Sequence, residues 1–270
     1  MTQDWLKILG MWNWEPSILL GIALFLGLYL AAIGPLRGRF KASSPVRNAQ
    51  SVYFIMGTFS IFLALVSPLD ELGDTYLFSA HMLQHAILVF VAPPLLLAGT
   101  PNWLADALIS PRLIRPIARV LTYPITAYFL FNLVFAGWHL PALYEAALEN
   151  QNIHIFEHLS FLFTALFNWW PVLSPSTLMG RLSYPAQMLY LFLESIPSTI
   201  LGAVISFAPN ILYPTYSSAP AQLGISPMLD QQIAGLIMAM PAAMAYLVVL
   251  TVVFFSWSKK EEHGALKQSG

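Results

Sequence analysis

The stretch HMLQHAILVFVAPPLLLAGTP, residues 81–101, indicates both the fold class of this chain and the kind of site it carries. An apolar run of about 20 residues is long enough to cross a hydrocarbon core of about 30 Å as a helix. Helices are required because lipid offers backbone amides no hydrogen-bond partner. The stretch therefore predicts a membrane-spanning helix with His81 and His85 at one end.

The composition predicts an all-α integral membrane protein. Of the 270 residues, 57% are hydrophobic and only 9% are charged, whereas a soluble domain has about one quarter charged residues. The chain has no cysteine, so disulfides, thiolate zinc sites and iron–sulfur clusters are excluded. Any bound metal would need histidine, methionine or carboxylate ligands.

Further apolar runs predict a bundle of seven transmembrane helices that form a single domain over residues 1–270. No repeat, low-complexity tract or soluble domain interrupts this pattern. An odd number of spans places the two termini on opposite sides of the membrane. The predicted spans are residues 17–34, 51–67, 80–99, 119–139, 155–174, 185–207 and 229–257.

The basic residues set the expected orientation. Under this topology, 11 of the 12 lysine and arginine residues fall on one face, and the positive-inside rule assigns that face to the cytoplasm. We therefore expect the N-terminus outside and the C-terminus in the cytoplasm. We also expect the first span to be retained, because its basic cluster follows it. The eleven residues are Arg37, Arg39, Lys41, Arg47, Arg112, Arg115, Arg119, Arg181, Lys259, Lys260 and Lys267.

Histidines recur at the outer ends of the predicted spans. The pairs HMLQH and HIFEH have i,i+4 spacing, which on a helix places both imidazoles on one side, about 5–6 Å apart. Ionisable groups inside a membrane are costly and usually face a site or pathway. The sequence therefore predicts a metal site made from His81, His85, His139, His154, His158 and Asp230.

Copper and zinc are the metals favoured by these ligands. Neutral imidazole suits both, and Met82 and Met228 offer soft sulfur that favours Cu(I). Glu157 and Asp230 are candidates to accept the second ring N–H of a ligating histidine. Helix capping explains the two carboxylates equally well.

Several functions remain open at this point. Three histidines and an acid would suit a membrane zinc hydrolase that activates water. His85 facing His139 would suit haem iron. A scaffold without metal would use the histidines as structural hydrogen-bonding residues.

Four segments together resemble the CtaG-type assembly factors of caa(3)-type cytochrome c oxidase, multi-span proteins of bacterial membranes. The resemblance covers most of the chain, and the family's histidine and acidic motifs fall on the six residues of the predicted metal site. This chain has Ala239 where the family pattern has a tryptophan after GLIM. The four segments are HMLQHAILVFVAPPLLLAGTP from His81, WHLPALYEAALEN from Trp138, HIFEHLSFLFTALFNWWPVL from His154 and DQQIAGLIM from Asp230.

The resemblance implies a role in maturing the oxidase at its copper-loading stage. We expect the cargo to be copper as Cu(I), with zinc as the alternative metal, and we expect no catalytic activity. The expected partners are the oxidase subunits and the lipid bilayer, with no nucleic acid. The expected location is the bacterial plasma membrane, which the chain would cross several times.

Overall fold

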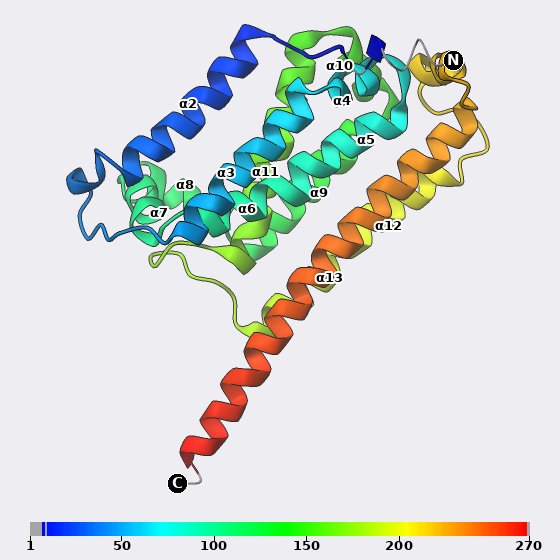
Figure 1. Cartoon of the computed structure of the whole chain (residues 1–270). Coiled ribbons are helices and arrows are strands. Elements are labelled where there is room, and N and C mark those ends of the chain that lie inside the picture. Colours follow the sequence, from blue (N-terminus) through cyan, green and yellow to red (C-terminus); the bar gives the residue numbers. More distant parts are fainter. Residues whose placement is uncertain (1–6, 9, 269–270) are drawn as a thin grey trace.

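The computed structural model describes residues 7, 8 and 10–268, and the described residues form helices and loops without a strand. Figure 1 shows α2 and α3 on one side of the bundle and the α12–α13 pair on the other. The main helices are α2 (Pro16–Ile33), α3 (Asn48–Val66), α9 (Pro124–Trp138), α11 (Gln151–Leu173), α12 (Tyr184–Ser206) and α13 (Pro227–Gln268), together with α5 (Phe78–Ala86) and α6 (Ala92–Gly99), which belong to one continuous helical segment.

Shorter helical segments connect these helices. Two of them, η2 and η3, are π-helical turns on either side of α5. The short segments are η1 (Arg37–Arg39), α4 (Pro68–Glu71), η2 (Leu72–Tyr76), η3 (Ile87–Val91), α7 (Asn102–Ile109), α8 (Ile114–Leu121), α10 (Pro141–Glu149), η4 (Pro214–Ser217) and η5 (Ala219–Leu223).

Prolines fix where several helices begin. Pro16, Pro124, Pro141 and Pro227 are each the first residue of a helix. Proline suits this position because its missing N–H would have no partner within the helix, and its fixed φ angle is already helical. The predicted first span, residues 17–34, agrees closely with α2, whereas the predicted fourth span, residues 119–139, begins inside α8 and before the Pro124 start of α9.

Five helical segments are long and apolar enough to cross a membrane: α2, α3, the continuous segment Phe78–Gly99, α12 and α13. The pair α8–α9 makes a sixth if the two count as one span, although they are bent by 74°. The remaining predicted span corresponds to α11, which has 23 residues. Its polar residues, among them His154, Glu157 and His158, keep it outside the group of sufficiently apolar helices.

The outer surface of the bundle is apolar. Leu28, Leu133, Leu189 and Leu247 are each at least 60% exposed. A soluble monomer rarely exposes so much apolar surface, whereas a membrane protein presents it to lipid. The described part of the chain is thus a helical membrane protein.

The α12–α13 pair is held together by a close backbone approach. A methyl group at Gly202 would collide with the carbonyl oxygen of Gly235, and one at Gly235 would collide with Gly202 and Ser206. Small residues of this kind allow helices to approach closely in a membrane, where packing replaces the hydrophobic effect between helices. Figure 1 shows α13 continuing past the ends of the other helices.

The two ends of the bundle differ in composition. Figure 1 shows α4, α10 and the start of α5 at one end, and α7 and α8 at the other. The first end carries Asp70, Glu71 and Asp74, while basic residues gather around α8 and η1. The basic residues around α8 and η1 thus lie at the end away from these carboxylates, as the predicted spans lead one to expect.

Candidate metal centre

His81 and His85 lie one helical turn apart on α5 and face the interior. Their side chains are 0% and 2% exposed, and their Nε2 atoms are 2.8 Å apart. This distance requires one ring to donate an N–H to the other, because two lone pairs at this separation repel. The π-helical turn η3 follows directly, and such turns are frequent at functional sites.

Helix α11 contributes His154, Glu157 and His158 to the same site. One ligand atom from each of these residues and one from His81 all lie within 4.8 Å of one another. The spacing of three and four residues places the three α11 side chains on one helix face. Glu157 Oε1 also lies 3.8 Å from Nε2 of His85.

Asp74 connects the two histidine pairs. Its Oδ1 lies 3.3 Å from Nδ1 of His81, and its Oδ2 lies 3.5 Å from Nδ1 of His154. Burial raises the pKa of Asp74 to about 6, although the nearby His154 opposes the rise. A carboxylate facing two Nδ1 atoms favours the tautomers that carry the proton there. Nε2 of His154 is then available to bind a metal, whereas Nε2 of His81 accepts the N–H of His85, a contact that a bound metal would replace.

His139 lies beside the cluster, at the end of α9. Its Nδ1 is 2.6 Å from the carbonyl oxygen of Phe135, which favours a proton on Nδ1. Its ring centre is 5.9 Å from that of His85. The Nε2 atom of His139 is therefore a lone-pair nitrogen that points at no hydrogen-bond donor among the described residues.

Several buried polar atoms at this site lack a hydrogen-bond partner within the described part of the chain. Buried polar groups are normally paired, and each exception calls for an explanation. A metal ion would accept lone pairs from part of this set, so the donor atoms fit a metal centre. The atoms are Oδ1 of Asp74, Nδ1 of His81 and His85, Nε2 of His139, His154 and His158, and both carboxylate oxygens of Glu157.

Asp230 occupies a different place from the histidines. Its carboxylate accepts hydrogen bonds from the backbone N–H of Phe78 at 2.7 Å and of Ser79 at 3.1 Å, and from the hydroxyl of Ser79. These are the first amides of α5, so Asp230 caps the helix that carries His81 and His85. This geometry favours a positioning role, and its place among the ligands stays a prediction.

A tyrosine pair supports the loop next to His81. The Tyr216 hydroxyl donates to the carbonyl oxygen of Gly73 at 2.5 Å and lies 3.2 Å from the Tyr144 hydroxyl. A methyl group at Gly73 would lie 2.9 Å from Cα of His81, so only glycine allows this approach. The loop that carries Asp74 is thereby held against α5.

Methionine sulfur is less prominent here than the sequence suggests. Met82 is 1% exposed and belongs to the main hydrophobic core, with Phe78 and Phe161. Methionine commonly fills such gaps between apolar side chains. The donor atoms that gather at the site are imidazole nitrogens and carboxylate oxygens.

Sequence reasoning did not single out Asp74 as a site residue. It lies between the second and third predicted spans, close to other acidic residues. Asp74 precedes His81 by seven residues, but helical spacing does not relate the two, because the backbone at Leu77 is extended and interrupts the helix. Its contact with His154 depends on the packing of η2 against α11, which the sequence does not reveal.

These features define a class: helical membrane proteins with a buried site rich in histidine and carboxylate. The family described as cytochrome c oxidase caa3 assembly factor matches residues 27–260. The match covers most of the chain, and the protein belongs to this family. The resemblance seen in the four sequence segments is thus confirmed.

Curated relatives are found in mycobacteria. Uncharacterized proteins of Mycobacterium bovis and Mycobacterium tuberculosis are each 22% identical over 97% of this chain. A similar relative from Mycobacterium leprae is also 22% identical. The chain spans 42% of the length of these relatives. No solved structure matches the chain.

Proposed function

We propose that this protein binds copper as Cu(I) at the histidine cluster and delivers it to subunits of the caa3-type oxidase during assembly. The observation that carries the proposal is the group formed by His81, His154, Glu157 and His158, with ligand atoms within 4.8 Å of one another. Family membership supplies the oxidase as the client. Copper is then a cargo, and the protein acts without catalysis.

The donor atoms support a transition metal over a hard cation. Imidazole suits copper and zinc, whereas calcium and magnesium prefer sites built from oxygen ligands. The site is lined by five histidines, with His85 and His139 next to the group of four. A cation would therefore have more nitrogen ligands available than it needs, and partial ligand sets would allow it to move between them.

The exposure of the side chains suggests a direction of entry. Asp74 is 32% exposed and His154 is 13% exposed, whereas His81 is fully buried. A cation arriving at the acidic end of the bundle would meet the Asp74 carboxylate first and His154 next. The negative charge at this end would raise the local concentration of cations.

We further propose that the chain crosses the bacterial plasma membrane seven times, with the metal site near the outer face. The proposal takes α9 as the crossing part of the α8–α9 pair and includes α11, whose polar residues would face the site rather than lipid. The basic residues around α8 and η1 lie at the other end of the bundle, which the positive-inside rule assigns to the cytoplasm.

Zinc hydrolysis is a second candidate, because three histidines with one carboxylate also suit a catalytic zinc ion. Glu157 would then act either as a ligand or as the general base. The two candidate functions predict different defects in a cell that lacks this protein. A copper-delivery protein is required for oxidase activity, whereas a hydrolase is required for turnover of its own substrate.

The test replaces His81 and His85 together by Leu in a strain that depends on this protein for oxidase assembly. We expect oxidase activity to fall at least 10-fold with unchanged abundance of the variant protein, and added copper to restore part of it. The matched control is His263→Leu, which changes an exposed histidine on α13. Full oxidase activity in the double variant would overturn the proposal.

A further inference from the structure

Helix α8 runs at a steep angle to the helix that follows it. The axes of Ile114–Leu121 and Pro124–Trp138 differ by 74°. If α9 crosses the membrane, a helix at this angle lies close to the membrane plane. Figure 1 places α8 at the end of the bundle away from the metal site.

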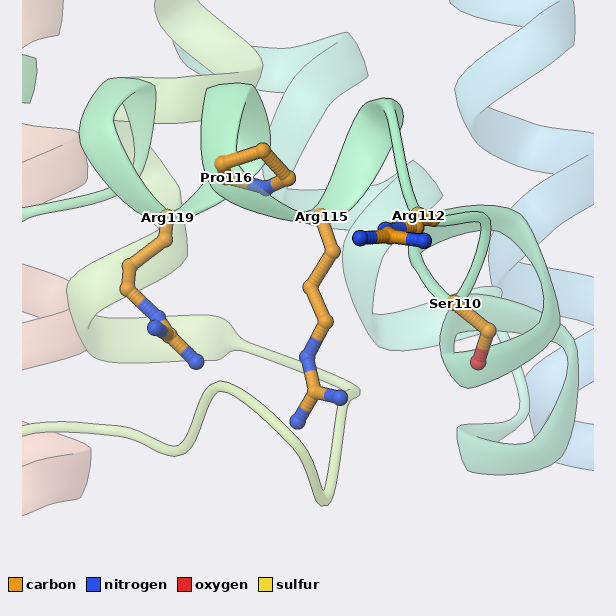
Figure 2. A pocket seen from close by; sticks show the side chains of 5 residues that line it. All are labelled: Ser110, Arg112, Arg115, Pro116 and Arg119. Carbon is orange, nitrogen blue, oxygen red and sulfur yellow. The ribbon is translucent and has the colours of Figure 1, made fainter.

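One side of α8 is basic. Arg115 and Arg119 are separated by four residues and share a helix face, and Arg112 lies in the turn just before. Figure 2 shows the side chains of Arg115 and Arg119 extending from the same side of the helix. Together with Ser110 and Pro116, the three arginines line a hollow of about 470 Å³.

The other side of α8 is apolar and open. Leu113 is 83% exposed, Ile117 is 60% exposed and Val120 is 59% exposed. These positions lie on the helix face opposite Arg115 and Arg119, as expected from 3.6 residues per turn. A short helix with one basic and one apolar face is typical of segments that lie in a membrane interface.

The charges of these three arginines are not balanced by carboxylates of the described residues. Arg112, Arg115 and Arg119 form no ion pair with the residues that the structure describes. The carboxylate of Asp106, on the preceding helix α7, already accepts hydrogen bonds from Ser176 and Thr177. Three clustered guanidinium groups without a carboxylate partner favour an anionic ligand, and guanidinium matches phosphate oxygens well.

We propose that the hollow beside α8 binds the phosphate headgroup of an anionic phospholipid. The arginines would contact the phosphate, while Leu113, Ile117 and Val120 would enter the acyl-chain boundary. The exposed apolar face on the other side of α8 selects a lipid over free phosphate, because a soluble anion would leave that face in water. The bound lipid would fix α8 at the membrane surface and with it the start of α9.

The test measures lipid binding by native mass spectrometry on the detergent-solubilised protein, titrated with phosphatidylglycerol. The variant carries Arg112→Gln, Arg115→Gln and Arg119→Gln. A matched control carries Arg37→Gln, Arg39→Gln and Lys41→Gln, which remove the same charge near the C-terminal end of α2. A third variant replaces the three α8 arginines by lysine and shows whether the fold tolerates substitution there.

We expect the glutamine variant of α8 to bind phosphatidylglycerol about 10- to 100-fold more weakly than the wild type. The control and the lysine variant should stay within a few-fold of the wild type, and phosphatidylcholine should bind none of them tightly. Equal affinity in the glutamine variant and the wild type would overturn the proposal. Displacement of the lipid by an equal concentration of inorganic phosphate would also overturn it, because the site would then be one for soluble anions.

Discussion

Nε2 of His81 and Nε2 of His85 lie 2.8 Å apart in the interior of the bundle, while Nδ1 of His81 lies 3.3 Å from Asp74. The most consistent protonation places a proton on Nδ1 of His81, facing the carboxylate, and one on Nε2 of His85. Nε2 of His81 then accepts the N–H of His85, and a metal ion that binds this nitrogen would replace that contact. A nearby carboxylate thus favours one tautomer of a buried histidine.

The substitution Glu157→Gln should weaken copper binding without lowering the stability of the protein. Both Glu157 oxygens are buried without a hydrogen-bond partner in the described chain, so an ionised carboxylate is costly there unless a cation is bound. We expect the affinity for copper to fall at least 10-fold, and the metal-free variant to be as stable as the wild type or more so. Competition with a coloured Cu(I) chelator measures the first, and thermal unfolding the second. Glu149→Gln, at an exposed position, is the control. Unchanged copper affinity in Glu157→Gln would contradict a role of Glu157 in binding the metal.

Asp230→Ala should destabilise the protein without removing the metal. The substitution removes the acceptor for the first amides of α5, and loss of such a cap costs about 0.5–2 kcal/mol. Thermal unfolding and metal content of the purified variant measure the two effects. Loss of metal with unchanged stability would show instead that Asp230 is a ligand.

The seven predicted spans each contain a helix, because long apolar runs are a strong signal. Length and composition support membrane crossing for five of them, or six with α8–α9 counted as one. The bend between α8 and α9 was not predicted. The bend falls just before Pro124. A helical conformation is disfavoured for the residue that precedes a proline, and this explains the break.

The candidate site was predicted in part. The i,i+4 spacing indicated that His81 pairs with His85 and His154 with His158, and both pairs are close in the structure. The role of Asp74 was not predicted, and helix capping was one of two alternatives left open for Asp230. Both depend on contacts between segments distant in the chain, and no local pattern encodes them.

Gly235→Val should weaken the α12–α13 pair. A side chain there would collide with the carbonyl oxygen of Gly202 and with Ser206. Overpacking of this kind typically costs about 1–3 kcal/mol. Gly21→Ala on α2 is the control, because a methyl group at Gly21 would meet nothing within 4 Å. Thermal unfolding in detergent compares the two, and equal stability of both variants would contradict the close packing.

The loop after α11 should respond to acid through Asp106. Although burial opposes the change, hydrogen bonds from Ser176 and Thr177 lower the pKa of Asp106 below its usual 3.8. A lowered pKa in the folded state means that the ionised carboxylate stabilises the fold above the usual pKa, and that this contribution is lost as the pH falls through the lowered value. Asp106→Ala should therefore be less stable than the wild type at pH 7. The difference should shrink as the pH falls below about 4, and a difference that does not change with pH would contradict this role.

The proposed function depends on copper binding by the histidine cluster. Elemental analysis of the purified protein, after loading with Cu(I) or with Zn(II) and removal of excess metal, measures this binding. We expect copper to be retained by the wild type and by His263→Leu, and to be lost in the variant with both His81→Leu and His85→Leu. Retention of zinc without copper would support the hydrolase, and equal copper content in the double variant and the wild type would contradict copper binding by this cluster.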